Sequence, residues 1–311
     1  MKKTIAYLQL IFVVFIWGIS PQFTLFFYKH YSPLAYITFG AAVSFVAYLA
    51  ISGKHIKEFN LSYILPGVLT GIFLALANMS QKIGLLYTTP AKYAFLENLS
   101  CISVPILMYI LLRKKPNIVT IFSCLMCLAG VLLLNGISFN MYSSWGIGET
   151  LCAAAGILYG FNITGAAVYA RRLYTPLFLA VQTLTTFIIY LISTLIFNNI
   201  SVGKTGKPLE KIVFTWQPKY IILMAVVILI TSAFCWTIRT NVLKTIDATV
   251  VSVIMPFTAV ITTVVSIIRK TDQLSVHFVV GAIVVLAAII LSSCSDIIVN
   301  KISKSSKKPL I

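Results

Sequence analysis

The sequence has few charged residues and very few acids. Asp and Glu total 7 against 24 Lys and Arg, and charged residues make up 10% of the 311 residues. Soluble domains average about 25% charged residues, so this composition excludes a water-soluble globule. A hydrophobic content of 59% also excludes a disordered chain. In a soluble protein the basic excess would suggest nucleic acid. Here the charges lie in short segments between apolar runs, which indicates membrane topology and no nucleic-acid partner.

The sequence also lacks the residue patterns of most enzymes. Its 3 histidines are scattered at positions 30, 55 and 277, and no Gly-rich loop ends in Lys-Ser or Lys-Thr. Cys124 and Cys127 have metal-ligand spacing, but no His or second pair of ligands stands beside them. Six cysteines all lie in apolar runs, at positions 101, 124, 127, 152, 235 and 294. We therefore read them as small buried hydrophobes rather than as a disulfide scaffold or metal ligands. The sequence predicts no enzyme, no catalytic residue, no cofactor and no metal.

Long apolar runs fill nearly the whole chain. A bilayer-spanning helix needs about 20 apolar residues, and runs of this size recur ten times. They are Thr4–Tyr28, Leu34–Ser52, Leu61–Gln81, Ala91–Leu112, Ile118–Asn135, Ile147–Ala170, Pro176–Asn198, Tyr220–Ile238, Ala248–Ile268 and Leu274–Ser295. Most connections are very short, and Asn199–Lys219 reads as the one long flexible loop. The fold class predicted is an all-α integral membrane protein with ten transmembrane helices.

The distribution of Lys and Arg predicts the orientation. With the N-terminus in the cytoplasm, the inside set is Lys2, Lys3, Lys54, Lys57, Arg113, Lys114, Lys115, Arg171, Arg172, Arg239, Lys244, Lys301, Lys304, Lys307 and Lys308. The outside set is Lys29, Lys82, Lys92, Lys204, Lys207, Lys211, Lys219, Arg269 and Lys270. The ratio of 15 to 9 follows the positive-inside rule, so we expect a multi-pass protein of the cell membrane with both termini cytoplasmic.

Weak internal similarity indicates a repeat. Phe15–Gly18 in the first run and Ile157–Gly160 in the sixth both end in an aromatic residue and Gly, and Pro105 and Pro256 are central in the fourth and ninth runs. Each half would contain five spans, and an odd number inserts the second half upside down. Two inverted five-helix repeats are the architecture of many secondary transporters, which bind substrate near mid-membrane between the repeats.

The order of these motifs resembles a known family. The segments that carry the likeness are Phe15–Pro21, Ser32–Leu34, Gln81–Pro105, Gly146–Glu149 and Leu243–Pro256. The sequence is similar over its whole length to the drug/metabolite transporter superfamily, specifically to EamA-type ten-helix permeases. It departs from that pattern at Thr38–Phe39, where an Arg-Phe pair is usual, at Glu97, where small residues are usual, and at Met255, where an acid is usual.

The resemblance implies a secondary transporter that moves a small organic metabolite, amino acid or amine-like, across the cell membrane by alternating access. It favours export. The domains expected are a first EamA-like repeat at 1–137, a second at 138–300 and a basic cytoplasmic tail at 301–311. The partners expected are a small-molecule substrate, the lipid bilayer and protons as a candidate coupling ion. Two alternatives remain open: an integral-membrane enzyme acting on lipid, and a membrane interaction protein that transports nothing.

Glu97 is the most informative single residue, because an acid inside an apolar span is costly and should face a cavity or a partner. Two functional interpretations are a counter-charge for a cationic substrate and a proton-coupling carboxylate. The alternative is a structural ion pair with Lys82 or Lys92. The other substrate-binding candidates are aromatic residues and amides within spans, which can stack on a ligand or bond to it. They are Trp17, Asn78, Gln81, Tyr93, Tyr159 and Trp236.

Overall fold

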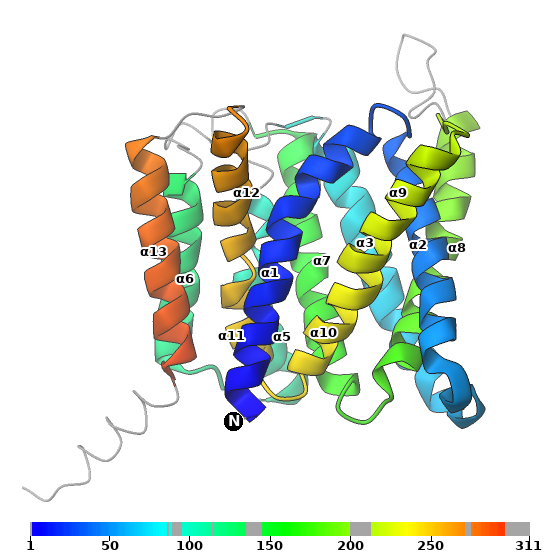
Figure 1. Cartoon of the computed structure of the whole chain (residues 1–311). Helices are drawn as coiled ribbons and strands as arrows, with labels where there is room; N and C mark the ends of the chain where they lie inside the picture. Colours follow the sequence, from blue (N-terminus) through cyan, green and yellow to red (C-terminus); the bar gives the residue numbers. More distant parts are fainter. Residues whose placement is uncertain are drawn as a thin grey trace, which may run out of the picture. The chain divides into compact units, whose positions relative to one another are not determined.

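The structure is a computed structural model that describes residues 2–85, 87–88, 95–113, 115–134, 145–199, 213–270 and 275–295. These residues form helices joined by short connections, with one isolated antiparallel bridge between Tyr31 and Phe214 (Figure 1). The α-helices are α1 (Lys2–Phe27), α2 (Pro33–Ser52), α3 (Ile64–Leu85), α5 (Ser100–Leu112), α6 (Ile118–Leu134), α7 (Ile147–Tyr169), α8 (Thr175–Asn199), α9 (Pro218–Ile228), α10 (Cys235–Val242), α11 (Ala248–Ile254), α12 (Phe257–Ile268) and α13 (Val276–Ser293). Two 3₁₀ turns, η1 (Gly53–Glu58) and η2 (Leu61–Tyr63), link α2 to α3, and η4 (Leu229–Phe234) is a π-helix.

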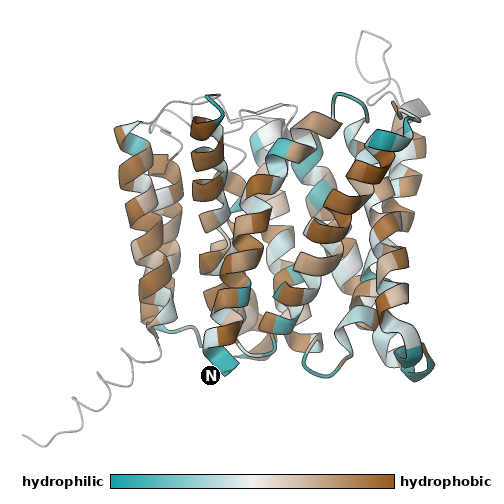
Figure 2. Cartoon of the chain, in the orientation of Figure 1, coloured by the Kyte–Doolittle hydropathy of each residue, from teal (hydrophilic) through white to brown (hydrophobic). Residues whose placement is uncertain are grey.

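The predicted membrane architecture is confirmed. Within the described residues, 9 helices are long and apolar enough to cross a membrane, and Ile118–Leu134 is a shorter apolar helix of 17 residues. Apolar residues fill the middle turns of these helices, while hydrophilic ones gather at the ends (Figure 2). Many of the apolar side chains face outward: Leu8 of α1 is 63% exposed and Ile290 of α13 is 64% exposed. Such surfaces suit lipid rather than water.

Two prolines within the apolar runs take different places in the structure. Met255 and Pro256 separate α11 from α12, as expected of a residue that cannot donate a backbone hydrogen bond. Pro21 lies inside α1, where its missing N–H would leave the Trp17 carbonyl without a partner. The Ser20 hydroxyl donates to that carbonyl at 2.9 Å. This substitution of a side chain for the lost backbone donor is the usual way in which a membrane helix tolerates proline.

Two compact units make up the chain, and neither coincides with one half of the sequence. Unit 1 comprises Met1–Lys82 and Gly165–Thr245, and unit 2 comprises Ile83–Thr164 and Ile246–Ile311. Unit 1 therefore contains α1, α2, α8, the span from α9 to α10, and most of α3. Unit 2 contains α5, α6, most of α7 and α11 to α13. Each unit thus combines helices from both halves of the sequence.

In unit 1 glycines allow α3 to approach α8 closely. A Cβ placed on Gly67 would lie 2.5 Å from the Val181 Cβ, and one on Gly71 would lie 2.8 Å from the Gln182 carbonyl oxygen. Gly67 and Gly71 stand four residues apart, on one face of α3, in the small-xxx-small pattern that brings membrane helices together. Close packing here fixes the position of the Gln182 segment of α8.

The expectation of a flexible loop over Asn199–Lys219 is wrong for its last part. Ser32 N–H donates to the Val213 carbonyl at 2.9 Å, and the Tyr31 hydroxyl donates to the Thr215 carbonyl at 3.1 Å. The segment before α9 is therefore bonded to the α1–α2 connection and extends the wall of unit 1. Residues 200–212 of the predicted loop lie outside the described part.

In unit 2 a glycine of α6, Gly130, lies close to a glycine of α13, Gly281. A Cβ on Gly130 of α6 would lie 2.9 Å from the Val285 backbone nitrogen of α13, and Gly281 of α13 packs against the Leu134 backbone. The core beside them contains Cys101, Cys124 and Cys127, each at most 2% exposed. The interpretation of these cysteines as small buried hydrophobes is confirmed.

Candidate functional site

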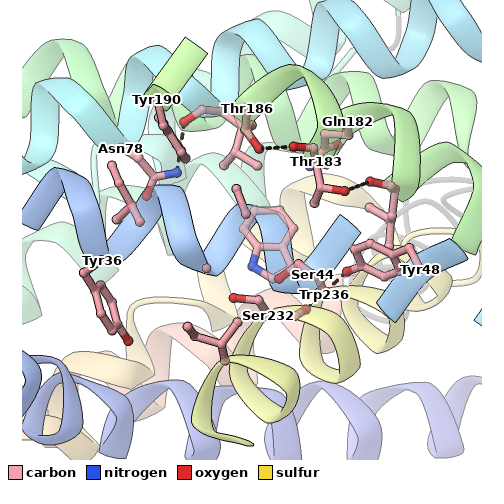
Figure 3. A pocket seen from close by; sticks show the side chains of 16 residues that line it. Tyr36, Ser44, Tyr48, Asn78, Gln182, Thr183, Thr186, Tyr190, Ser232 and Trp236 are labelled. Carbon is pink, nitrogen blue, oxygen red and sulfur yellow. Dashed lines mark hydrogen bonds between the residues drawn. The ribbon is translucent and has the colours of Figure 1, made fainter. Parts of the chain in front are cut away.

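Unit 1 contains a partly open cavity of about 150 Å³ among its membrane-spanning helices (Figure 3). Helices α2, α3 and α8 form three walls, and the continuous span from α9 through η4 to α10 forms the fourth. The lining residues are Tyr36, Ile37, Gly40, Ala41, Ser44, Tyr48, Leu74, Asn78, Leu179, Gln182, Thr183, Thr186, Tyr190, Ile228, Ser232 and Trp236. A polar-lined cavity in otherwise apolar helices is a candidate ligand site.

The lining is polar without being charged. Among the described residues that line the cavity, none is Asp, Glu, Lys or Arg. Several hydroxyls already use their proton inside the protein. Thr183 donates to the Leu179 carbonyl at 2.7 Å, and Thr186 donates to the Thr183 carbonyl at 2.9 Å (Figure 3). These oxygens retain only lone pairs for a ligand, so they act as acceptors.

Two further polar atoms of the cavity have unused hydrogen-bonding capacity. Gln182 is 1% exposed and Ser44 is 2% exposed. No described residue forms a hydrogen bond with Gln182 Oε1 or Ser44 Oγ. Leaving a buried polar atom unsatisfied costs about 1–3 kcal/mol. Both atoms belong to residues that line the cavity, so the chain's own groups leave hydrogen-bonding capacity unused there.

The π-helix η4 shapes the fourth wall. A π turn widens the helix and is frequently found at functional sites. Two aromatic donors from other helices brace it: Trp17 Nε1 of α1 donates to the Thr231 carbonyl at 2.7 Å, and the Tyr48 hydroxyl of α2 donates to the Ser232 carbonyl at 3.2 Å. The cavity wall is thereby fixed by specific bonds to α1 and α2.

Trp236 follows η4, lines the cavity and packs on two neighbouring side chains. Its ring lies 5.6 Å from the Trp17 ring, and the guanidinium carbon of Arg239 lies 4.6 Å from the Trp236 ring centroid. Arg239 is 3% exposed. This is a cation–π contact in a poorly solvated place, where such contacts reach about 2 kcal/mol. The Arg239 guanidinium therefore lies against an aromatic ring that lines the cavity.

Contacts beyond the cavity tie α8 to α10. The Thr175 hydroxyl, at the start of α8, donates to Asn241 Oδ1 at 2.6 Å. Lys244, just after α10, donates from Nζ to the Leu173 carbonyl at 3.3 Å. Partial burial lowers the pKa of Lys244, because desolvation disfavours its charged form. These bonds hold two walls of the cavity at a fixed separation.

Comparison with known proteins decides the family. A model of the EamA-like transporter family matches residues 4–136 and again residues 146–294. The chain belongs to the EamA-like transporter family. Because two stretches match one model, the halves of this EamA protein are repeats. With five spans in each, the second repeat is inverted relative to the first.

Structural comparison agrees on the fold. One solved structure, described only as "Crystal structure of protein", is similar with a TM-score of 0.72 at 15% identity, covering 93% of this chain and 97% of that chain. At that identity the likeness shows a shared fold alone. No curated protein matches the sequence. The chain is thus a multi-pass membrane protein of a family that transports small molecules across membranes.

Four of the predicted site residues lie in unit 1 of the EamA protein. Asn78 and Trp236 line the cavity. Trp17 does not line it but packs on Trp236 and bonds to η4. Gln81 is buried in α3, 4% exposed, and is not among the lining residues. Their proposed roles in binding stay predictions.

Of the other three predicted residues, Glu97 and Tyr159 are not among the lining residues of this cavity. Tyr93 falls outside the described residues. Glu97 and Tyr159 are half-buried residues of unit 2. The backbone at Glu97 packs on α7, since a Cβ on Gly156 would lie 3.0 Å from the Glu97 carbonyl oxygen. The proposed roles of Glu97 and Tyr159 in binding stay predictions.

Glu149 caps the start of α7. Its Oε2 accepts the Gly146 N–H at 3.0 Å, at the first turn of α7, and its Oε1 accepts the Thr88 hydroxyl at 2.8 Å. A carboxylate at this point satisfies a backbone donor and suits the helix dipole. Glu149 is thus a structural residue of unit 2.

Most of the cavity-lining residues do not stand out singly in the sequence, although their spacing carries a signal. Gln182, Thr186 and Tyr190 stand four residues apart on α8. Side chains at that spacing share one helix face, so they form a polar stripe in an apolar helix. Ser44 and Tyr48 of α2 repeat the spacing. Single polar residues in spans carry little information, whereas such stripes mark a face turned away from lipid.

Proposed function

We propose that this protein is a secondary transporter that moves a small polar organic metabolite across the cell membrane by alternating access, in the direction of export. The polar cavity of unit 1 is the observation that supports this most. It receives α2 and α3 from the first repeat, and α8 and the α9–α10 span from the second. A site built by both repeats can open to either side when one repeat moves relative to the other.

Driving force is proposed to come from an ion gradient, with protons as the coupling ion. Glu97 is the proposed coupling group, because an acid within a membrane span is a default functional candidate. The expectation of an amine-like substrate also depends on Glu97, which would balance its positive charge. The cavity of unit 1 supplies no acid of its own among its described lining residues, so a small polar cargo of amino-acid size is the better-supported class.

Proteoliposome transport tests the proposal. Purified protein should catalyse exchange of radiolabelled small amino acids, amides or polyols between the lumen and the medium, and an imposed proton gradient should drive accumulation. The control is the Trp216→Ala protein, because Trp216 is 81% exposed and lies outside the cavity. Failure of every member of the panel to move above protein-free liposomes, with folded protein, would contradict the proposal.

Membrane orientation is a separate prediction. Reporters fused after Ile311 and inserted at Arg113–Lys115 should both report the cytoplasm, because the basic residues are concentrated on that side. In unit 1 the start of α1, the end of α2 and the end of α10 lie at one end of the unit, as alternating spans require (Figure 1). A reporter at either position that reads as external would refute the ten-span orientation.

A further inference from the structure

The geometry points to a binding site in the unit 1 cavity for an uncharged solute of about six to eight non-hydrogen atoms, which presents N–H or O–H donors to Gln182 Oε1 and Ser44 Oγ. The inference rests on the proposed function only in taking this solute to be the transported cargo. It names the chemistry of the cargo, which family membership leaves open.

The first support is the pair of unsatisfied atoms. Gln182 Oε1 can only accept a hydrogen bond, and Ser44 Oγ can accept or donate one. Both side chains are almost fully buried, and no described residue bonds to either atom. A ligand that carries two donors satisfies both at once. The close packing of Gly71 on the Gln182 carbonyl holds this segment of α8 in place before any ligand arrives.

The second support is the direction of the remaining hydrogen bonds. The hydroxyl groups of Thr183, Thr186 and Tyr48 each donate a hydrogen bond to a backbone carbonyl of unit 1. Their oxygens therefore add acceptors to the cavity rather than donors. A lining rich in acceptors selects a donor-rich molecule, such as an amide, a ureide or a polyol, over an ether or a ketone of equal size.

The third support is the electrostatics. The described lining residues include no carboxylate that could balance a cation, and an uncompensated charge in a low-dielectric site costs several kcal/mol. An anion would meet the lone pairs of Gln182 and the threonines. An uncharged solute avoids both penalties.

The size of the ligand follows from the volume. The cavity measures about 150 Å³. An engineered protein cavity of about that volume holds one benzene molecule. A solute of about that size therefore fills the cavity without displacement of its walls.

Four probe molecules of equal size test whether the site selects its ligand by charge and by hydrogen-bond donors. The set is malonamide (uncharged, four N–H), malonate (anionic), malonamidine (cationic) and pentane-2,4-dione (uncharged, no N–H). Binding is measured by thermal stabilisation of the full-length protein in detergent and by change of tryptophan fluorescence, since Trp236 lines the cavity. Malonamide should bind at least tenfold more tightly than the other three. Equal or tighter binding of any of them, or no binding of malonamide, would overturn the inference.

Variants then locate the site. Gln182→Leu removes the acceptor and Ser44→Ala removes the hydroxyl, and each should weaken malonamide binding roughly threefold to tenfold, the value of one neutral hydrogen bond. Gln182→Glu keeps the shape, adds a negative charge and should reverse the selection, so that malonamidine binds more tightly than malonamide. Gln22→Leu is the matched control, because Gln22 is an amide of α1 in the same unit and does not line the cavity.

The outcomes separate this site from the transport proposal. Unchanged malonamide affinity in both Gln182→Leu and Ser44→Ala would overturn the site, even if proteoliposomes transport other solutes. Malonamide that binds with the expected variant pattern, but shows no protein-dependent flux, would support the site and contradict the transport of this class. Ser44→Ala keeps the test decisive if a Gln182 variant fails to fold.

Discussion

Glu97→Gln is expected to abolish uphill accumulation of cargo while exchange of cargo between the two sides continues. An uncharged cargo needs no counter-charge, so the remaining functional role for this acid is to carry the coupling proton. Such a carrier needs a carboxyl group whose pKa is raised by burial, and Gln keeps the shape but cannot titrate. Accumulation ratio in proteoliposomes under an imposed proton gradient, compared with counterflow at equal pH, measures the two activities separately.

The matched control for this prediction is Glu58→Gln. Glu58 lies in η1, its side chain is 60% exposed, and it pairs with His55 at 2.8 Å. Exposed pairs of this kind contribute little, so accumulation should remain normal. Loss of binding itself in Glu97→Gln would instead support a counter-charge for a cationic cargo. Normal uphill transport would mean that Glu97 forms a structural ion pair with a lysine.

Trp236→Ala is expected to destabilise the protein by about 3 kcal/mol and to abolish binding in the cavity. The change removes a wall of the cavity, the ring that packs on Trp17, and the aromatic face on which the Arg239 guanidinium rests. Loss of a large packed ring costs about 3–5 kcal/mol when fully buried, and loss of a desolvated cation–π contact about 2 kcal/mol. Thermal and denaturant unfolding in detergent measure the effect.

Two companion variants decide the physical cause. Trp236→Phe keeps an aromatic face under Arg239 and should recover more than half of the lost stability. Arg239→Met in the Trp236→Ala background should cost less than it does alone, because the charge has already lost its contact. Trp216→Ala, at a side chain 81% exposed, should change stability by less than about 0.5 kcal/mol. Equal costs of Arg239→Met in both backgrounds would show that the two residues are independent.

Sequence reasoning reached the candidate site only partly, and the reason differs between residues. Trp236 and Asn78 stood out because aromatic and amide side chains are costly or distinctive within a span, and both line the cavity. In the sequence, Gln182 is one of several polar amides within the spans and has no distinguishing feature. Its significance depends on its Oε1 atom, which accepts no hydrogen bond from the described residues. Only the neighbouring helices decide whether that atom has a partner. Trp17 was assigned a ligand-facing role, whereas the structure shows its indole N–H bonded to the Thr231 carbonyl.

The sequence by itself determined the membrane class, the ten apolar spans and the two inverted repeats, because hydropathy over about 20 residues and the order of local motifs do not depend on which helices are neighbours. The cap at Glu149 and the burial of Cys101, Cys124 and Cys127 were likewise local properties. Only the tertiary structure decided the helix partners. It placed α2 and α3 of one repeat with α8 and α10 of the other, where Thr38 of α2 and Thr194 of α8 meet at 3.0 Å between their hydroxyl oxygens. Every span is apolar on most faces, so hydropathy cannot choose among neighbours. That choice is made by close backbone approach at Gly67 and Gly71, and by single donors such as Trp17 and Tyr48 finding carbonyls more than 180 residues away.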